Sequence, residues 1–231
     1  ALDANLILDG GGGRAGLTQY IAERQAADLG TNNQGRLQVS STGNNIELAE
    51  TVPGSLFGFT LKGLTSQDAG ILAGAPAGSP PQATFSVAAQ PAAGSTLTVT
   101  LGLPDGTTMD LVLTAAGGNG TNGFAIGATT ADTANNISSA PQTALQTAGK
   151  TQLAAASVKS AALDFFHGSS TNPPRRVAGP PYETATSFVA GTANNTVLWY
   201  QGTDDGNDPR NDAIAKISDR LSVAFGARAN E

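Results

Sequence analysis

The chain has 231 residues, enough for one large or two small domains with a buried core. Hydrophobic residues make up 39% of the sequence and charged residues only 13%, a balance that excludes an intrinsically disordered chain. The formal net charge is −6 with scattered basic residues, which disfavours nucleic-acid binding, and the lack of cysteine excludes disulfide frameworks, thiolate zinc sites and cysteine nucleophiles.

The N-terminal segment combines a glycine-rich motif with a predicted helix. Residues Gly11 to Gly16 match the pattern G-x-G-x-x-G. No acidic strand end and no series of βαβ units follow, as a dinucleotide-binding fold would require, so we interpret the motif as a flexible loop. Apolar residues in helical phase then predict a helix from Leu17 to Leu29, with Gly30 as its C-terminal stop.

Short alternating runs of apolar residues follow this helix. They lie at 37–39, 46–48 and 57–61 and are separated by Gly, Asn or Pro. This pattern is typical of antiparallel sheet. Two further alternating runs, 97–103 and 109–113, flank a Pro-Asp-Gly turn and predict the clearest hairpin in the chain.

Two helices are predicted next, from about Thr130 to Ala148 and from about Thr151 to Phe166. Pro141 lies inside the first, so we expect either a kink there or a new helix that begins near Ser139. His167, the single histidine, follows the second helix, where an imidazole can stabilise a helix C-terminus. One histidine cannot form a multi-histidine metal site, and no partners for a Ser-His-Asp triad stand out.

The last third of the sequence predicts strands from Thr196 to Tyr200, from Ile214 to Ile217 and from Leu221 to Phe225. Four aspartates lie between the first two of these strands, and carboxylate oxygens suit calcium. Their spacing lacks the third-position ligand and the closing glutamate of an EF-hand loop, so we interpret the segment as a solvated turn. The aspartates are Asp204, Asp205, Asp208 and Asp212.

Two proline-rich stretches, 70–82 and 169–181, are predicted to be linkers, because adjacent prolines fit neither a helix nor a central strand. They bracket residues 83–168, which carry their own strand and helix signals and predict an inserted, distal α+β domain.

The remaining residues predict a discontinuous proximal β-rich domain, formed by 31–75 together with 177–231, and a helical segment at 1–30. The expected fold class is therefore α+β, mainly antiparallel β and elongated, with the distal subdomain inserted into the proximal one.

Four residues are candidate contacts for a glycan. Trp199 and Tyr182 offer aromatic faces that can pack on a sugar ring, and Arg175 and Arg176 can hold an anionic group. Strand alternation would place Trp199 and Tyr200 on opposite faces, with one of the two in the core. Adjacent arginines after prolines are also typical of a solvated linker, so both interpretations stay open.

Four passages carry a family resemblance: YIAERQAADLG at 20–30, RRVAGPPY at 175–182, TVLWYQG at 196–202 and AFGARANE at 224–231. Together they resemble the central region of alphaproteobacterial flagellins and flagellin-like hook-associated proteins. In that family this region projects outward between the coiled-coil segments that build the filament core. The long heptad segments are missing here, so we expect either a trimmed central fragment or a parent protein that forms no filament.

The resemblance implies a structural, non-enzymatic protein without a cofactor, located outside the cell on the bacterial flagellum. Its partners would be other flagellin subunits, contacted through the missing coiled-coil segments. The chain alone is expected to be a monomer that contacts neither nucleic acid nor membrane. Two alternatives remain: a hook–filament junction protein, and a glycan-binding module on a flagellin scaffold that contacts surface polysaccharide through the four candidate residues.

Overall fold

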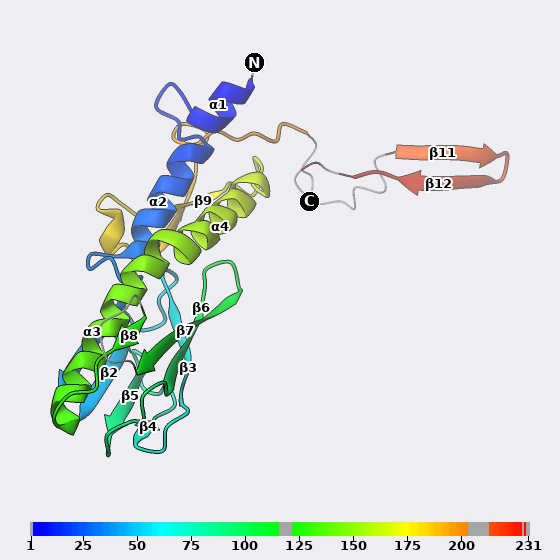
Figure 1. The fold of residues 1–231 in the computed structure, drawn as a ribbon. Coiled ribbons are helices and arrows are strands. Elements are labelled where there is room, and N and C mark those ends of the chain that lie inside the picture. Colours follow the sequence, from blue (N-terminus) through cyan, green and yellow to red (C-terminus); the bar gives the residue numbers. More distant parts are fainter. Residues whose placement is uncertain (1, 116–121, 203–212, 228, 230–231) are drawn as a thin grey trace. The chain divides into compact units, whose positions relative to one another are not determined.

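The computed structural model describes residues 2–115, 122–202, 213–227 and 229. The fold is α+β, as predicted, and its strands form four small sheets in which β7 and β8 are the one parallel pair among the described residues (Figure 1). The chain divides into two compact units. Unit 1 comprises 1–23, 161–177 and 188–231, and unit 2 comprises 24–160 and 178–187.

Unit 2 is built from two four-stranded sheets and helix α3 (Thr130–Ala148), which packs against strands of both sheets (Figure 1). One sheet has the order β1-β2-β5-β4 and the other β3-β6-β7-β8. The strands of the first are β1 (Leu37–Thr42), β2 (Asn45–Glu50), β5 (Gln82–Val87) and β4 (Ile71–Ala73). Those of the second are β3 (Thr60–Ser66), β6 (Thr96–Gly102), β7 (Thr108–Ala115) and β8 (Gly123–Phe124).

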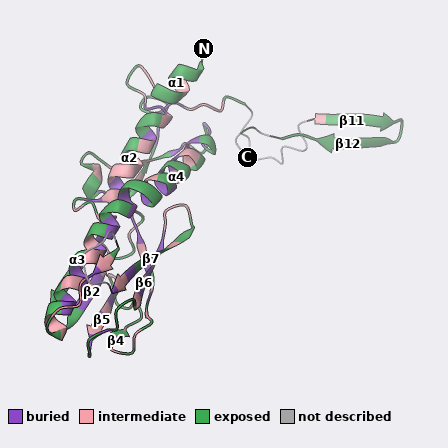
Figure 2. Ribbon diagram, in the orientation of Figure 1, coloured by how far each residue is buried: buried purple, intermediate pink, exposed green. Residues whose placement is uncertain are grey.

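Alternation along the strands explains the core of unit 2. In β6, Leu97, Val99 and Leu101 are fully buried, while the threonines between them are partly exposed. The same alternation of buried and partly exposed residues marks β2 and β5 (Figure 2). Because α3 contributes Ile137 and Leu145 to the same hydrophobic cluster, both sheets and the helix share one core.

This shared core corrects the predicted domain boundaries. Residues 31–75 and 83–168 were expected in separate domains, but β2 pairs with β5 and β3 pairs with β6, so each sheet draws strands from both segments. The predicted linker 70–82 contains β4, whose Ile71 is buried. Pairing between strands distant in sequence merges the two segments, a feature that local pattern does not reveal.

The predicted helices are present. Helix α2 spans Leu17–Leu29 and is followed by Gly30 with a φ of +71°, a value that favours glycine. Helix α3 starts after a capping box formed by Thr129 and Asp132, and Pro141 lies inside it without a new helix start. A π-helical turn, η1 (Gly149–Leu153), connects α3 to α4 (Ala154–Phe166).

Unit 1 contains α1 (Ala4–Asp9), the first turns of α2, the end of α4, and two two-stranded sheets. Its small core combines Ala15, Tyr20, Phe165 and Val197. The sheets pair β9 (Arg175–Val177) with β10 (Phe188–Ala190) and β11 (Ala213–Ser218) with β12 (Leu221–Phe225). The segment 178–187, which includes the short helix η2 (Tyr182–Thr184), belongs to unit 2.

The strand predicted from Thr196 to Tyr200 is wrong. Only Thr196 makes a β-bridge, a single parallel one to Ala15. By contrast, the predicted strands at the end of the chain are confirmed as the β11–β12 hairpin. β9 also lies within 169–181, where a linker was predicted.

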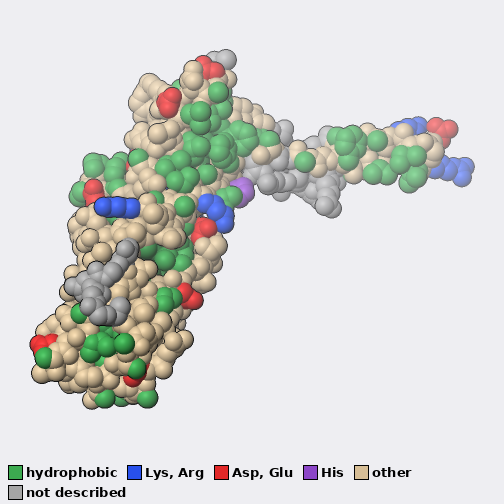
Figure 3. Space-filling view, in the orientation of Figure 1, with side chains coloured by type: hydrophobic (Ala, Val, Ile, Leu, Met, Phe, Trp, Pro, Cys, Tyr) green, Lys and Arg blue, Asp and Glu red, His purple; other side chains and the backbone are tan. Residues whose placement is uncertain are grey.

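The β11–β12 hairpin exposes nearly all of its side chains (Figures 2 and 3). Residues opposite each other in an antiparallel pair share a face, so Ala215 and Val223 lie on the same face, as do Ala213 and Phe225. Val223 is 45% exposed and Phe225 55% exposed. Within the described chain, this apolar face is therefore uncovered.

None of the described helices is both long enough and apolar enough to cross a membrane.

Candidate functional site

The two arginines predicted to contact a glycan are each held by a carboxylate of unit 1. Nε of Arg175 donates to Oδ1 of Asp164 at 3.2 Å, and its guanidinium lies 4.9 Å from the centre of the Phe188 ring. Arg176 forms an ion pair with Glu23 and donates from Nη1 to the carbonyl oxygen of Asn195 at 3.1 Å. Both guanidinium charges are thus compensated within the protein.

The two aromatic candidates belong to different units. Trp199, in unit 1, donates from Nε1 to the carbonyl oxygen of Phe166 at 2.9 Å, and its ring meets the Phe166 ring edge to face at 5.4 Å. Its ring also lies 6.0 Å from that of Tyr200, so the predicted placement of these two residues on opposite faces of a strand is wrong. Tyr182 lies in η2 of unit 2. Tyr182 therefore belongs to a different unit from the other three candidates.

The other motifs bring together no cluster that could hold a metal ion among the described residues. His167 directly follows α4, the position predicted for it, and its backbone N–H donates to the carbonyl oxygen of Leu163. Asp204, Asp205, Asp208 and Asp212 lie outside the described residues. Elsewhere in the described chain, no three His, Asp or Glu side chains gather in a way that could hold a metal ion.

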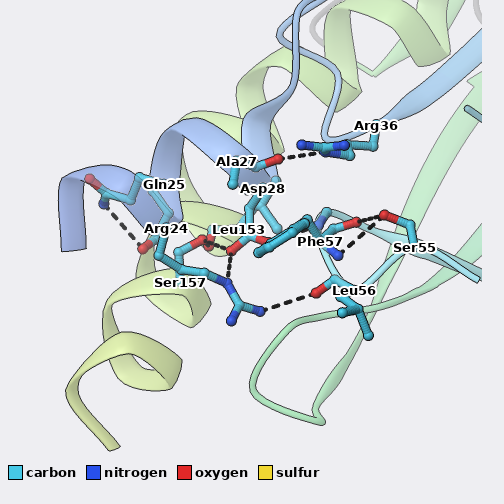
Figure 4. Close-up of polar contacts among 12 residues, drawn as sticks. Arg24, Gln25, Ala27, Asp28, Arg36, Ser55, Leu56, Phe57, Leu153 and Ser157 are labelled. Carbon is cyan, nitrogen blue, oxygen red and sulfur yellow. Dashed lines mark hydrogen bonds and ion pairs between the residues drawn. The ribbon is translucent and has the colours of Figure 1, made fainter. Parts of the chain in front are cut away.

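A buried polar network in unit 2 surrounds Asp28 of α2 (Figure 4). Its Oδ2 accepts from Nε of Arg24 at 2.8 Å and from Oγ of Ser157 at 2.8 Å, and its Oδ1 accepts from the backbone N–H of Gly58 at 2.8 Å. Burial raises the pKa of Asp28, although Arg24 and the hydrogen bonds favour the charged form. The network joins α2, α4 and the loop before β3.

Arg36 lies next to this network and contacts both α2 and Phe57. Its Nε donates to the carbonyl oxygen of Ala27 at 2.6 Å, and its guanidinium lies 5.3 Å from the centre of the Phe57 ring, which Arg24 also approaches (Figure 4). Desolvation lowers the pKa of Arg36, and its Nη2 atom finds no hydrogen-bond partner in the described structure. Asp28 and Arg36 are both buried, so the arrangement serves to hold the elements of unit 2 together.

Sequence reasoning missed this network. Both Arg24 and Asp28 lie in the predicted helix 17–29, and their i,i+4 spacing was the available signal. Ser157 lies 129 residues further along the chain, and no local pattern links it to Asp28.

The glycine-rich motif forms a tight turn. Gly12 and Gly13 have φ angles of +60° and +83°, and Gly11 and Arg14 exchange two backbone hydrogen bonds of 3.0 and 3.1 Å. A Cβ on Gly16 would collide with the backbone of Gly10, so close packing requires glycine there. The motif follows helix α1 rather than a strand, the opposite of the context that dinucleotide binding needs.

Beside this turn, unit 1 contains a cavity of about 650 Å³, which we call the Arg14 cavity. Apolar side chains from Leu2, Leu6 and Leu198 line it, together with the polar side chains of Arg14, Ser170 and Thr196. Ala15 connects these segments: its N–H donates to the carbonyl oxygen of Asn195, and its carbonyl accepts from the N–H of Val197, both at 2.9 Å. The turn and residues 195–198 are thereby held side by side.

Comparisons with protein-family models, with curated proteins and with solved structures gave no match to this chain.

Proposed function

We propose that the chain is the outer, surface-exposed part of a flagellin or flagellin-like protein, a structural component of the bacterial flagellum outside the cell. It would act without catalysis and without a cofactor. The resemblance of its four sequence passages to that family supports the proposal.

The path of the chain is the observation that carries the proposal. Residues 1–23 and 188–231 both belong to unit 1, whereas 24–160 build the separate core of unit 2. A polypeptide whose two end segments share one unit, with its largest core formed between them, suits a domain carried by a longer protein. This is the arrangement expected of an outer domain that leaves a filament core and returns to it.

The β11–β12 hairpin gives further support. Two-stranded hairpins are marginally stable in water unless another element packs against their apolar face. Val223 and Phe225 are exposed in the isolated chain. In a filament, neighbouring subunits would supply the missing cover.

Immunogold electron microscopy of the source bacterium tests the proposal, with antibodies raised against this chain. Label along the whole filament is the expected result. The control uses the same antibodies after absorption with the purified chain, which should remove the label.

Other labelling patterns separate the alternatives. Label confined to the hook region would replace the filament assignment with a hook–filament junction protein. Label on the cell envelope of cells without filaments would overturn the flagellar assignment and favour the glycan-binding module.

A further inference from the structure

Arg14 stands apart from the two paired arginines of unit 1. Arg175 and Arg176 are each held by a carboxylate. Arg14 is half-buried and lines the Arg14 cavity, and its guanidinium makes no hydrogen bond or ion pair with any residue that the structure describes. A partly desolvated cation without a counter-charge among the described residues favours an anionic ligand.

The backbone presents Arg14 in a fixed place. On one side, the turn through Gly12 and Gly13 is closed by the two hydrogen bonds between Gly11 and Arg14. On the other side, both backbone groups of Ala15 are bonded to residues 195 and 197. Pre-organisation of this kind lowers the cost of binding, because little backbone freedom is left to lose.

The walls of the cavity indicate what the anion carries. Leu2, Leu6 and Leu198 supply aliphatic surface, and the Ser170 hydroxyl has no hydrogen-bond partner within the described residues. Neither an acidic nor an aromatic side chain is among the described lining residues. Aromatic faces are the usual platform for a sugar ring, so these walls suit an aliphatic group better. The volume of about 650 Å³ lies within the range of about 300–1,000 Å³ typical of small-molecule pockets.

We propose that the Arg14 cavity binds a carboxylate with an aliphatic body. The planar guanidinium of Arg14 would take both carboxylate oxygens, Ser170 would donate a further hydrogen bond, and the leucines would cover the hydrocarbon. The site is independent of the flagellar assignment, since every residue in it belongs to unit 1 of this chain.

Isothermal titration calorimetry of the full chain with butyrate, hexanoate and octanoate tests the proposal. The dissociation constant should fall about fourfold for each added methylene, the factor that corresponds to about 0.8 kcal/mol per buried CH₂. Arg14→Gln should weaken octanoate binding by about tenfold or more, as expected for a charged hydrogen-bonded partner. Arg220→Gln is the matched control, because it removes the same charge from an exposed site on the hairpin turn and should leave binding unchanged.

Ala193→Trp provides a second variant that does not alter charge. Ala193 is exposed and lines the cavity, so the larger ring should block the ligand while far-UV circular dichroism shows an unchanged fold. Three results would overturn the proposal: no saturable octanoate binding, binding that Arg14→Gln leaves unaltered, or equal affinity for sulfate and octanoate. Binding of galacturonate in preference to octanoate would also overturn it, since the ligand would then be an acidic sugar.

Discussion

Arg175 and Arg176 are adjacent in sequence, yet the structure predicts very different consequences of removing them. The Arg176 side chain is 15% exposed and its partner Glu23 3%, whereas Arg175 is 63% exposed and its partner Asp164 25%. Arg176→Ala leaves a buried carboxylate without its guanidinium, which costs about 3–5 kcal/mol. Arg175→Ala removes an exposed pair, which contributes about 1 kcal/mol or less.

Urea denaturation followed by tryptophan fluorescence measures this difference, because Trp199 is the one tryptophan in the sequence and lies in unit 1. With a urea dependence of about 1–3 kcal/mol per molar, a loss of 3 kcal/mol lowers the midpoint by about 1–3 M. Arg175→Ala is the matched control and should shift the midpoint much less. Equal, small shifts for both variants would refute the reasoning, since the buried pair of Arg176 and Glu23 would then stabilise unit 1 no more than the exposed pair of Arg175 and Asp164.

Three further predictions concern unit 2, followed by far-UV circular dichroism in urea. Phe85→Ala removes a fully buried ring and should cost about 3–5 kcal/mol. Gly58→Ala should lower the free energy of unfolding by at least about 1–2 kcal/mol, because φ is +82° and the new Cβ would lie 2.5 Å from a backbone oxygen. Gly54→Ala is the control: it also has a positive φ but lies in open space, so the loss should be smaller. Burial raises the pKa of Asp28 above 3.8, so the folded state binds its proton more tightly than the unfolded state does. The free energy of unfolding should therefore fall as the pH rises from 3.8 through the folded pKa. Asp28→Asn removes this titration and should flatten that fall.

Local signals in the sequence predicted much of the secondary structure. The bounds of α2 and α3 agree with the predicted helices, because helical phase and the stop at Gly30 act within a few residues. The capping box at Thr129, which the structure shows, is equally local. The β6–β7 hairpin likewise follows from alternation around a short turn. These features depend on neighbours in sequence, which a pattern can show.

The domain boundaries and the Arg14 cavity depend on contacts between residues that are distant in sequence, and local sequence patterns do not predict such contacts. Strand alternation gave no sign that β5 would pair with β2 across a proline-rich stretch. The glycine motif marked the position of Arg14, but the walls of its cavity come from Leu6 and Leu198, almost 200 residues apart in sequence. The prolines of 70–82 predicted a linker there, whereas the structure places the short strand β4, with its buried Ile71, beside them.

The β11–β12 hairpin allows a prediction that separates the isolated chain from an assembled protein. Val223 is 45% exposed, so Val223→Lys should change the unfolding free energy of the isolated chain by about 0.5 kcal/mol or less. If the apolar face packs on neighbouring subunits, the same change buries an unpaired charge in each contact, and gold label along filaments should be lost. Ser222→Lys, on the opposite face, is the control and should leave the label in place. A large loss of stability in the isolated Val223→Lys chain would show instead that the hairpin packs within its own chain, and the apolar face would no longer support an intersubunit contact.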